Sequence, residues 1–191
     1  SEFVDPKSGV SARMSITGYE NLISTAERRS LLNGETQTAV RFSDLMGMIP
    51  SITGKVELVY EGEQEGSDFV ANHLISEATK TLFLMYFPKI EKLKKPNQTS
   101  VYDAVIDWFI QADNIELSDE ATNKDYQKVL STLKPLDELL LMYQPKLAKE
   151  DVNFLKEFIL WALVELKQLS KKRTEKGILF NDVFDSYIKS M

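Results

Sequence analysis

No cysteine occurs among the 191 residues, which excludes disulfides, thiolate metal sites and cysteine catalysis. Histidine is almost as scarce, because His73 is the only one, and it falls in the middle of an expected helix. A metal site needs several converging ligands, and His73 has no His or Cys partner. We interpret it as a partly exposed or hydrogen-bonded helix residue.

Long hydrophobic runs are also lacking. The most apolar stretch, residues 154–169, contains Lys156, Glu157, Glu165 and Lys167, and it is too short for a bilayer, which takes about 20 apolar residues. Residues 1–9 are polar and contain no signal-peptide core. The net charge of −6 is spread along the chain, which argues against binding to nucleic-acid phosphates. We therefore expect a cytoplasmic protein with no membrane and no nucleic-acid partner.

A nucleotide-binding loop is missing too. The P-loop motif requires glycine, four residues, Gly-Lys and then Ser or Thr. The only Gly-Lys pair that we compared with this motif is Gly54-Lys55. Ile49 occupies the position of the first glycine and Val56 that of the Ser or Thr, so the motif is not met. We expect no cofactor in this chain and no enzyme activity from the chain by itself.

The composition that remains, 43% hydrophobic and 27% charged, is typical of a globular protein. Helical periodicity and helix-ending Gly or Pro residues predict an all-α fold: a helical bundle with additional C-terminal helices and at most one short strand or hairpin near residues 55–61. We expect a helical subdomain over residues 1–95 and a C-terminal helical extension, packed on it, over 96–191. The expected helices cover residues 11–32, a segment within 39–48, residues from 67 to a stop at Pro88, and residues 100–112, 118–133, 136–143, 149–173 and 181–189. Residues 52–61 could be either a short strand or helical.

An acidic run precedes the helix expected at residue 67. It contains Glu57, Glu61, Glu63 and Glu65, and its spacing does not fit the calcium loop of an EF-hand. One interpretation is a solvated loop leading into a helix N-terminus, where carboxylates are favoured. The other is a contact with a partner or a neighbouring subunit through Glu61, Glu63 and Glu65.

Arg13 lies in the first turn of the first expected helix. A cation there faces the positive end of the helix dipole, which is slightly unfavourable. An acid or a phosphate opposite Arg13 would offset this cost.

Two stretches of the chain resemble the lid of AAA+ ATPases of the magnesium-chelatase and MoxR-like group. The first comprises residues 9–14, 19–22 and 26–29, with the sequences GVSARM, YENL and AERR. The second comprises residues 41–45 and 52–66, with the sequences RFSDL and ITGKVELVYEGEQEG. Together they cover about residues 9–90, whereas residues 100–191 match only in being expected to be helical.

The resemblance implies a helical lid packed on a nucleotide-binding core, within a homo-oligomeric ring of about six subunits. By position, Arg13 corresponds to the second-sensor arginine, which reaches the nucleotide γ-phosphate in such proteins. ATP and magnesium are implied for the full-length protein, whose N-terminal AAA+ core is missing from this chain. The implied partners are that core, neighbouring subunits and a von Willebrand-type partner protein.

An alternative from another functional class stays open at this point. The chain could be a freestanding all-α adaptor that binds a partner helix in an aromatic groove. The groove residues would be Trp108, Phe109, Phe158 and Trp161.

Overall fold

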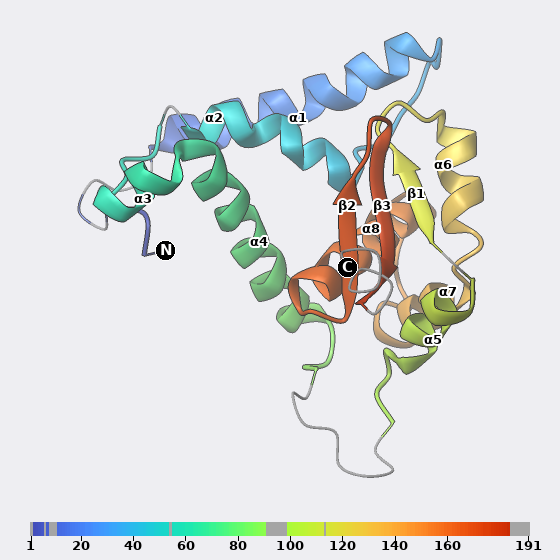
Figure 1. Cartoon of the computed structure of the whole chain (residues 1–191). Coiled ribbons are helices and arrows are strands. Elements are labelled where there is room, and N and C mark those ends of the chain that lie inside the picture. The colour runs from blue at the N-terminus through green and yellow to red at the C-terminus, as the bar shows by residue number, and fades with distance from the viewer. Residues whose placement is uncertain are drawn as a thin grey trace. The chain divides into compact units, whose positions relative to one another are not determined.

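The computed structural model describes residues 2–5, 7, 11–53, 55–90, 99–112 and 114–183 (Figure 1). The chain is mainly helical, as expected, and carries in addition a small antiparallel sheet. It divides into two compact units, residues 1–78 and 79–191, and the division falls inside helix α4 (Ser67–Tyr86). The separate roles expected for residues 1–95 and 96–191 stay predictions.

The first unit is built around the long helix α1 (Ala12–Leu32). Helix α1 packs against the 3-10 helix η1 (Phe42–Met48) and against α2 (Ile49–Thr53). The approach to η1 is close, since a Cβ added to Gly47 would lie 2.1 Å from the Thr25 hydroxyl oxygen. Helix α3 (Tyr60–Glu65) and the start of α4 complete this unit.

Two expectations for the first unit can be compared with the structure. The helix expected within residues 39–48 is the 3-10 helix η1, which begins at Phe42, because the Asp44 carboxylate accepts a hydrogen bond from the Arg41 backbone N–H (2.8 Å) and fixes the start there. No strand or hairpin forms over residues 55–61 in the described chain, where Leu58 makes only a single bridge to Val4. Instead, α3 begins at Tyr60, with two glutamates in its first turn, where carboxylates are favoured.

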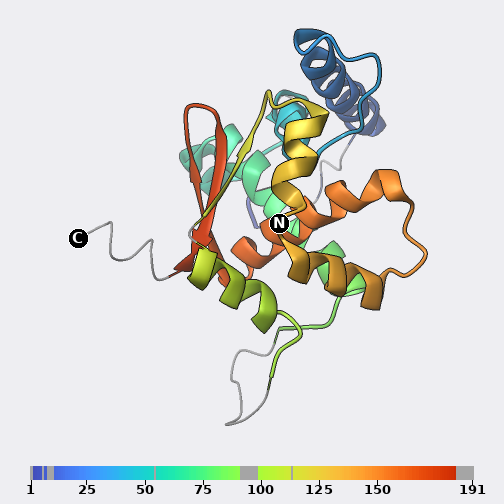
Figure 2. The same ribbon diagram turned by 90° about the vertical axis from the view of Figure 1, so that its right-hand side faces the viewer.

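The second unit combines helices with the sheet (Figures 1 and 2). The strands are ordered β1-β3-β2, and both pairs are antiparallel. Besides the end of α4, its elements are α5 (Asp103–Ala112), β1 (Ile115–Ser118), α6 (Asn123–Leu130), α7 (Lys134–Tyr143), η2 (Lys149–Asp151), α8 (Val152–Glu165), β2 (Leu169–Arg173) and β3 (Gly177–Asp182).

Helix α8 forms the centre of the second unit. It contacts α6, α7 and strand β2, and the side chains of Ile159, Leu160 and Leu163 are fully buried. Two charged residues of α8 are buried as well. The Lys156 ammonium donates to the Leu130 carbonyl (3.0 Å) and pairs with Asp137 (2.7 Å), while the Glu157 carboxylate accepts from the Tyr126 hydroxyl (2.6 Å).

The helix expected over residues 149–173 extends too far at its C-terminal end, because the observed helix stops eight residues before residue 173. Helix α8 ends at Glu165, and the chain reverses through Lys167, a non-glycine residue with a φ of 60°. The Gln168 and Lys167 N–H groups donate to the Leu163 and Val164 carbonyls, which is the pattern of a Schellman cap. Residues 171–173, expected at the helix C-terminus, lie in β2.

The sheet also replaces the starts of two other expected helices. Residue 118 ends strand β1, and the next helix begins after Thr122, whose hydroxyl caps the Asp125 N–H (3.1 Å). Of the helix expected over 181–189, Asn181 and Asp182 belong to β3, and residues 184–189 lie outside the described part of the chain. The register places Gly177 beside Ser118, where an added Cβ would lie 2.0 Å from the Leu117 carbonyl oxygen.

Candidate functional site

Arg13 lies on α1 with its side chain exposed to solvent. The helix starts at Ser11, whose hydroxyl accepts from the Arg13 backbone N–H (3.2 Å), and no acidic residue lies in the first turn. Within the described part of the chain, the Arg13 guanidinium makes neither a hydrogen bond nor an ion pair. The side chain is therefore available to a group supplied from elsewhere.

One face of α1 is packed and the opposite face is open. On the packed side, the Asn21 amide donates to the Ser51 hydroxyl (2.6 Å) and the Lys55 ammonium donates to the Thr17 hydroxyl (2.6 Å). The open face repeats at steps of three or four residues, as one side of a helix does. It carries the exposed residues Arg13, Ile16, Glu20, Glu27 and Leu31 and the half-buried Ile23.

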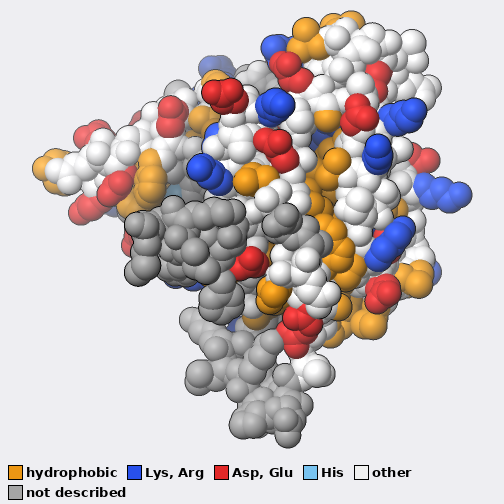
Figure 3. Space-filling model, turned by 45° about the vertical axis from the view of Figure 1, so that its right-hand side comes forward, with side chains coloured by type: hydrophobic (Ala, Val, Ile, Leu, Met, Phe, Trp, Pro, Cys, Tyr) orange, Lys and Arg blue, Asp and Glu red, His pale blue; other side chains and the backbone are white. Residues whose placement is uncertain are grey.

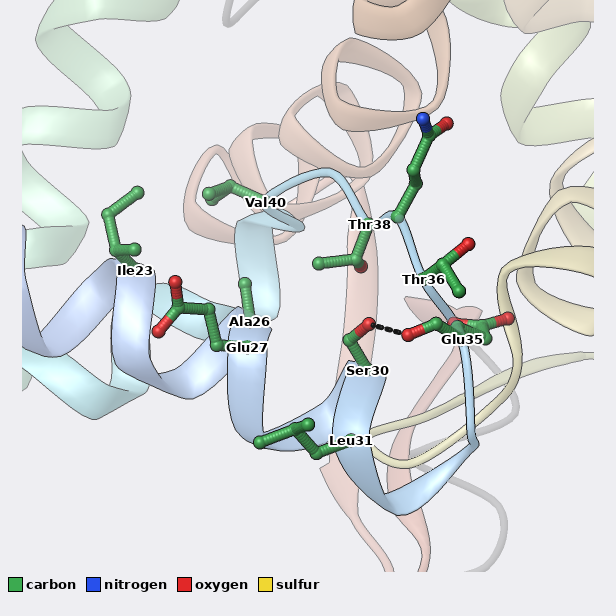
Figure 4. Close-up of a pocket in the computed structure, with 10 residues that line it drawn as sticks. Ile23, Ala26, Glu27, Ser30, Leu31, Glu35, Thr36, Thr38 and Val40 are labelled. Atoms are coloured by element: carbon green, nitrogen blue, oxygen red, sulfur yellow. Dashed lines mark hydrogen bonds between the residues drawn. The ribbon is translucent and has the colours of Figure 1, made fainter.

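The C-terminal half of α1 borders a cavity of about 850 Å³ (Figure 4). Side chains of α1 line one side, and side chains of the connection over residues 35–40 line the other. The lining is mixed, with apolar groups of Ile23, Leu31 and Val40 beside the carboxylates of Glu27 and Glu35. A cavity of this size is in the range of ligand and peptide sites.

A buried ion pair supports the wall of the cavity. The Arg29 guanidinium, with only 3% of its side chain exposed, donates to both carboxylate oxygens of Asp44 at 2.9 Å. It also donates to the Ala39 carbonyl (2.8 Å) and the Thr38 hydroxyl (3.2 Å). Arg29 thereby ties the connection that lines the cavity to both α1 and η1.

Neither this ion pair nor the cavity was predicted from the sequence. The signal available for the pair was that Arg29 is in phase with Gly18, Asn21 and Thr25 on the packed face of α1. A charged residue in such a position is buried only with a partner. No comparable signal existed for the cavity, because its second wall has no regular periodicity.

Glu61, Glu63 and Glu65 are all exposed on helix α3 and belong to a helix rather than to a loop. Among the described residues, no group of three or more His, Cys, Asp or Glu side chains is arranged to hold a metal ion. His73 is half-buried in α4, where its ring lies 5.1 Å from the ring of Phe3 and 6.4 Å from that of Phe69. The role of the three glutamates in a partner contact stays a prediction.

The aromatic groove expected for an adaptor does not form. Phe109, Phe158 and Trp161 are buried in the core of the second unit, and only Trp108 is partly exposed. Trp161 packs against Phe180, and the Lys171 ammonium lies 4.0 Å from the centroid of its ring. These aromatic residues pack in the core of the second unit, so they do not line a groove that a partner helix could enter.

Charged side chains of both signs are interspersed over the face of the molecule in Figure 3. None of the helices in the described part of the chain has the length and apolar content that a bilayer span requires. No protein-family model, no curated protein and no solved structure matches this chain.

Proposed function

We propose that this chain is the lid and C-terminal helical region of a magnesium-chelatase-like AAA+ ATPase. In this role it couples the nucleotide state to subunit assembly and to the remodelling of a partner protein, while the ATP-binding core lies in another part of the full-length protein. The observation that carries the proposal is the Arg13 guanidinium in the first turn of α1, which is exposed and has no partner among the described residues.

The chemistry of this position fits a phosphate sensor. A guanidinium stays charged and forms paired hydrogen bonds to phosphate oxygens. A cation at a helix N-terminus costs about 0.3–1 kcal/mol, and an acid in the first turn, which would offset that cost, is absent from α1. A phosphate supplied by the ATP-binding core would provide the missing negative charge.

A second observation supports the resemblance on which the proposal is built. The Arg29–Asp44 ion pair links the two stretches that resemble the lid, since Arg29 belongs to the first and Asp44 to the second. The pair joins α1 firmly to η1, so that a force applied at Arg13 would move these elements together. A lid that reports the nucleotide state needs this kind of rigidity.

The proposed partners follow from this role. They are the ATP-binding core of the same protein, neighbouring subunits of a ring and a von Willebrand-type partner protein. The exposed carboxylates of Glu61, Glu63 and Glu65 on α3 are available for contacts between subunits. ATP and magnesium would be held mainly by the core, with Arg13 as this chain's contribution.

An ATPase assay on the full-length protein tests the proposal. Arg13→Ala should lower the turnover number by about tenfold to a hundredfold, because hydrogen bonds to a charged group contribute about 1.5–3 kcal/mol. Arg28→Ala, an exposed arginine elsewhere on α1, should leave turnover unchanged. Unchanged hydrolysis in a correctly folded Arg13→Ala variant would refute the sensor assignment, and a full-length protein without a P-loop would refute the whole proposal.

A further inference from the structure

A second cation lies close to Arg13, although it comes from a different segment of the chain. The Lys55 backbone N–H donates to the Ile52 carbonyl (3.0 Å), which fixes Lys55 in the turn that follows α2. The Lys55 ammonium donates to the Thr17 hydroxyl (2.6 Å), and that hydroxyl donates to the Arg13 carbonyl (2.8 Å). Since Thr17 follows Arg13 by four residues, their side chains are neighbours on α1, with Cβ atoms about 5–6 Å apart. Arg13 and Lys55 therefore form a two-cation cluster around Thr17.

Neither cation of this cluster has a carboxylate partner among the residues that the structure describes. Within them, the Thr17 hydroxyl is the one acceptor for the Lys55 ammonium, which leaves two of its three donor hydrogens unused. The Arg13 guanidinium has no partner in the same set of residues. Glu20, the first acid along α1, is exposed and pairs with neither described cation. The cluster is therefore a local excess of positive charge.

Other shielded lysines of this chain do pair with an acid. Lys171 is half-buried, as Lys55 is, and its ammonium lies 2.7 Å from the Glu165 carboxylate. The ammonium of the buried Lys156 lies 2.7 Å from the Asp137 carboxylate. Two cations held close together without such a partner repel each other, and the repulsion is stronger where solvent is partly excluded. An anion bound between them would remove this cost.

We propose that Arg13 and Lys55 bind one terminal phosphate group together, with Lys55 as a second contact to the γ-phosphate of the nucleotide. This inference rests on the proposed function, because the ATP-binding core would hold the rest of the nucleotide. The guanidinium forms paired hydrogen bonds to two phosphate oxygens, and the ammonium supplies a compact point charge for the third. A terminal phosphate carries a charge of about −1.5 to −2 near pH 7, which two cations match. The Thr17 hydroxyl positions the ammonium.

A shared site makes a distinct prediction about nucleotide preference. ADP lacks the phosphate that both cations contact, so removal of the Lys55 charge lowers the affinity for the triphosphate and leaves the affinity for ADP nearly unchanged. A lysine that only joined the end of α2 to α1 through Thr17 would behave differently. Its replacement would lower the stability of the first unit and would change the affinities for both nucleotides equally.

Calorimetry on the full-length protein, with a non-hydrolysable ATP analogue and with ADP, tests the shared site. Lys55→Gln removes the charge but keeps an N–H group that can donate to Thr17, whereas Lys55→Arg keeps the charge. Lys124→Gln, at an exposed lysine of α6 in the second unit, is the matched control. Thermal unfolding of each variant measures its stability in parallel.

We expect Lys55→Gln to weaken binding of the ATP analogue by about tenfold and to change ADP affinity little. Lys55→Arg should retain most of the affinity, and Lys124→Gln should change the affinity for neither nucleotide. Because the contact is ionic, the difference between the wild-type protein and Lys55→Gln should become smaller as salt increases. The unfolding temperature of Lys55→Gln should stay close to that of the wild-type protein.

Two results would overturn the shared site. One is an affinity of Lys55→Gln for the ATP analogue equal to that of the wild-type protein, and the other is an equal loss for both nucleotides. In either case the sensor role of Arg13 would stand, provided that Arg13→Ala still weakens binding of the triphosphate alone. No effect of Arg13→Ala, whatever Lys55→Gln does, would refute the sensor role and the shared site together. The results that refute the shared site alone therefore differ from those that refute the sensor role.

Discussion

The buried ion pair between Arg29 and Asp44 allows a sharp prediction about the stability of the first unit. Only 3% of the Arg29 side chain and 6% of the Asp44 side chain are exposed. Asp44→Asn removes the negative charge and leaves the guanidinium buried without its countercharge. Breaking such a pair from one side costs about 3–5 kcal/mol. That is a large part of the 5–15 kcal/mol by which a domain is typically stable.

Hydrogen exchange is the suitable assay, because a chain of two units does not have to unfold in one step. Amides in the middle of α1 should exchange faster by about a hundredfold or more in Asp44→Asn, while amides of α8 should be unaffected. Replacing both partners, as Arg29→Met with Asp44→Leu, should recover part of the protection, because neither charge of the pair is then left alone, while the Arg41 N–H still loses its acceptor.

Arg173→Ala provides the control, because Arg173 pairs with Asp119 at the surface, where 60% of the arginine side chain is exposed. Exposed pairs contribute at most about 1 kcal/mol. An Asp44→Asn variant that changes exchange in α1 no more than Arg173→Ala changes exchange around β2 would contradict this prediction.

Two further predictions concern the second unit. Burial, with a smaller effect from Tyr143, raises the pKa of the Tyr102 hydroxyl, which donates to the Pro88 carbonyl (2.6 Å). The folded state therefore keeps this proton to a higher pH than the unfolded state does. The free energy of unfolding should fall as pH rises above the unfolded pKa of about 10. Urea titrations of Tyr102→Phe should show a smaller fall in this free energy over the same pH range. Tyr126→Phe should cost about 1.5–3 kcal/mol in urea unfolding, because the buried Glu157 carboxylate loses a hydrogen bond; a cost below that of Arg173→Ala would contradict this.

The helices whose signals are local could be predicted from the sequence. Helix α1 begins one residue after Ser11 and ends before Asn33, and α4 begins at Ser67 and ends at Tyr86, before the expected stop at Pro88. Both have clear periodicity and an end marked by Asn-Gly or by Pro88. For Arg13, the sequence predicted the placement in the first turn, but it could not indicate that the guanidinium has no partner among the residues that the structure describes.

The sheet could not be predicted in the same way, because its pairing is non-local. Residues 169–173 continue the apolar and charged pattern of α8, and only their pairing with β3 makes them a strand. The chain reverses at Lys167, which has a positive φ. Glycine or asparagine usually occupies such a helix C-cap position, so the lysine gave no signal that the helix ends here. For β1, the sequence did contain a signal. Ile115 and Leu117 alternate with Glu116, and this pattern indicates a strand, but it was not used to predict one.

We propose that, in the full-length protein, the Arg13 guanidinium contacts the γ-phosphate of a bound nucleotide. Calorimetry on the full-length protein with a non-hydrolysable ATP analogue and with ADP tests this most directly. We expect Arg13→Ala to weaken binding of the triphosphate by about tenfold or more and to change ADP affinity little, while Arg28→Ala should change neither. Equal effects on both nucleotides, or no effect on either, would contradict it.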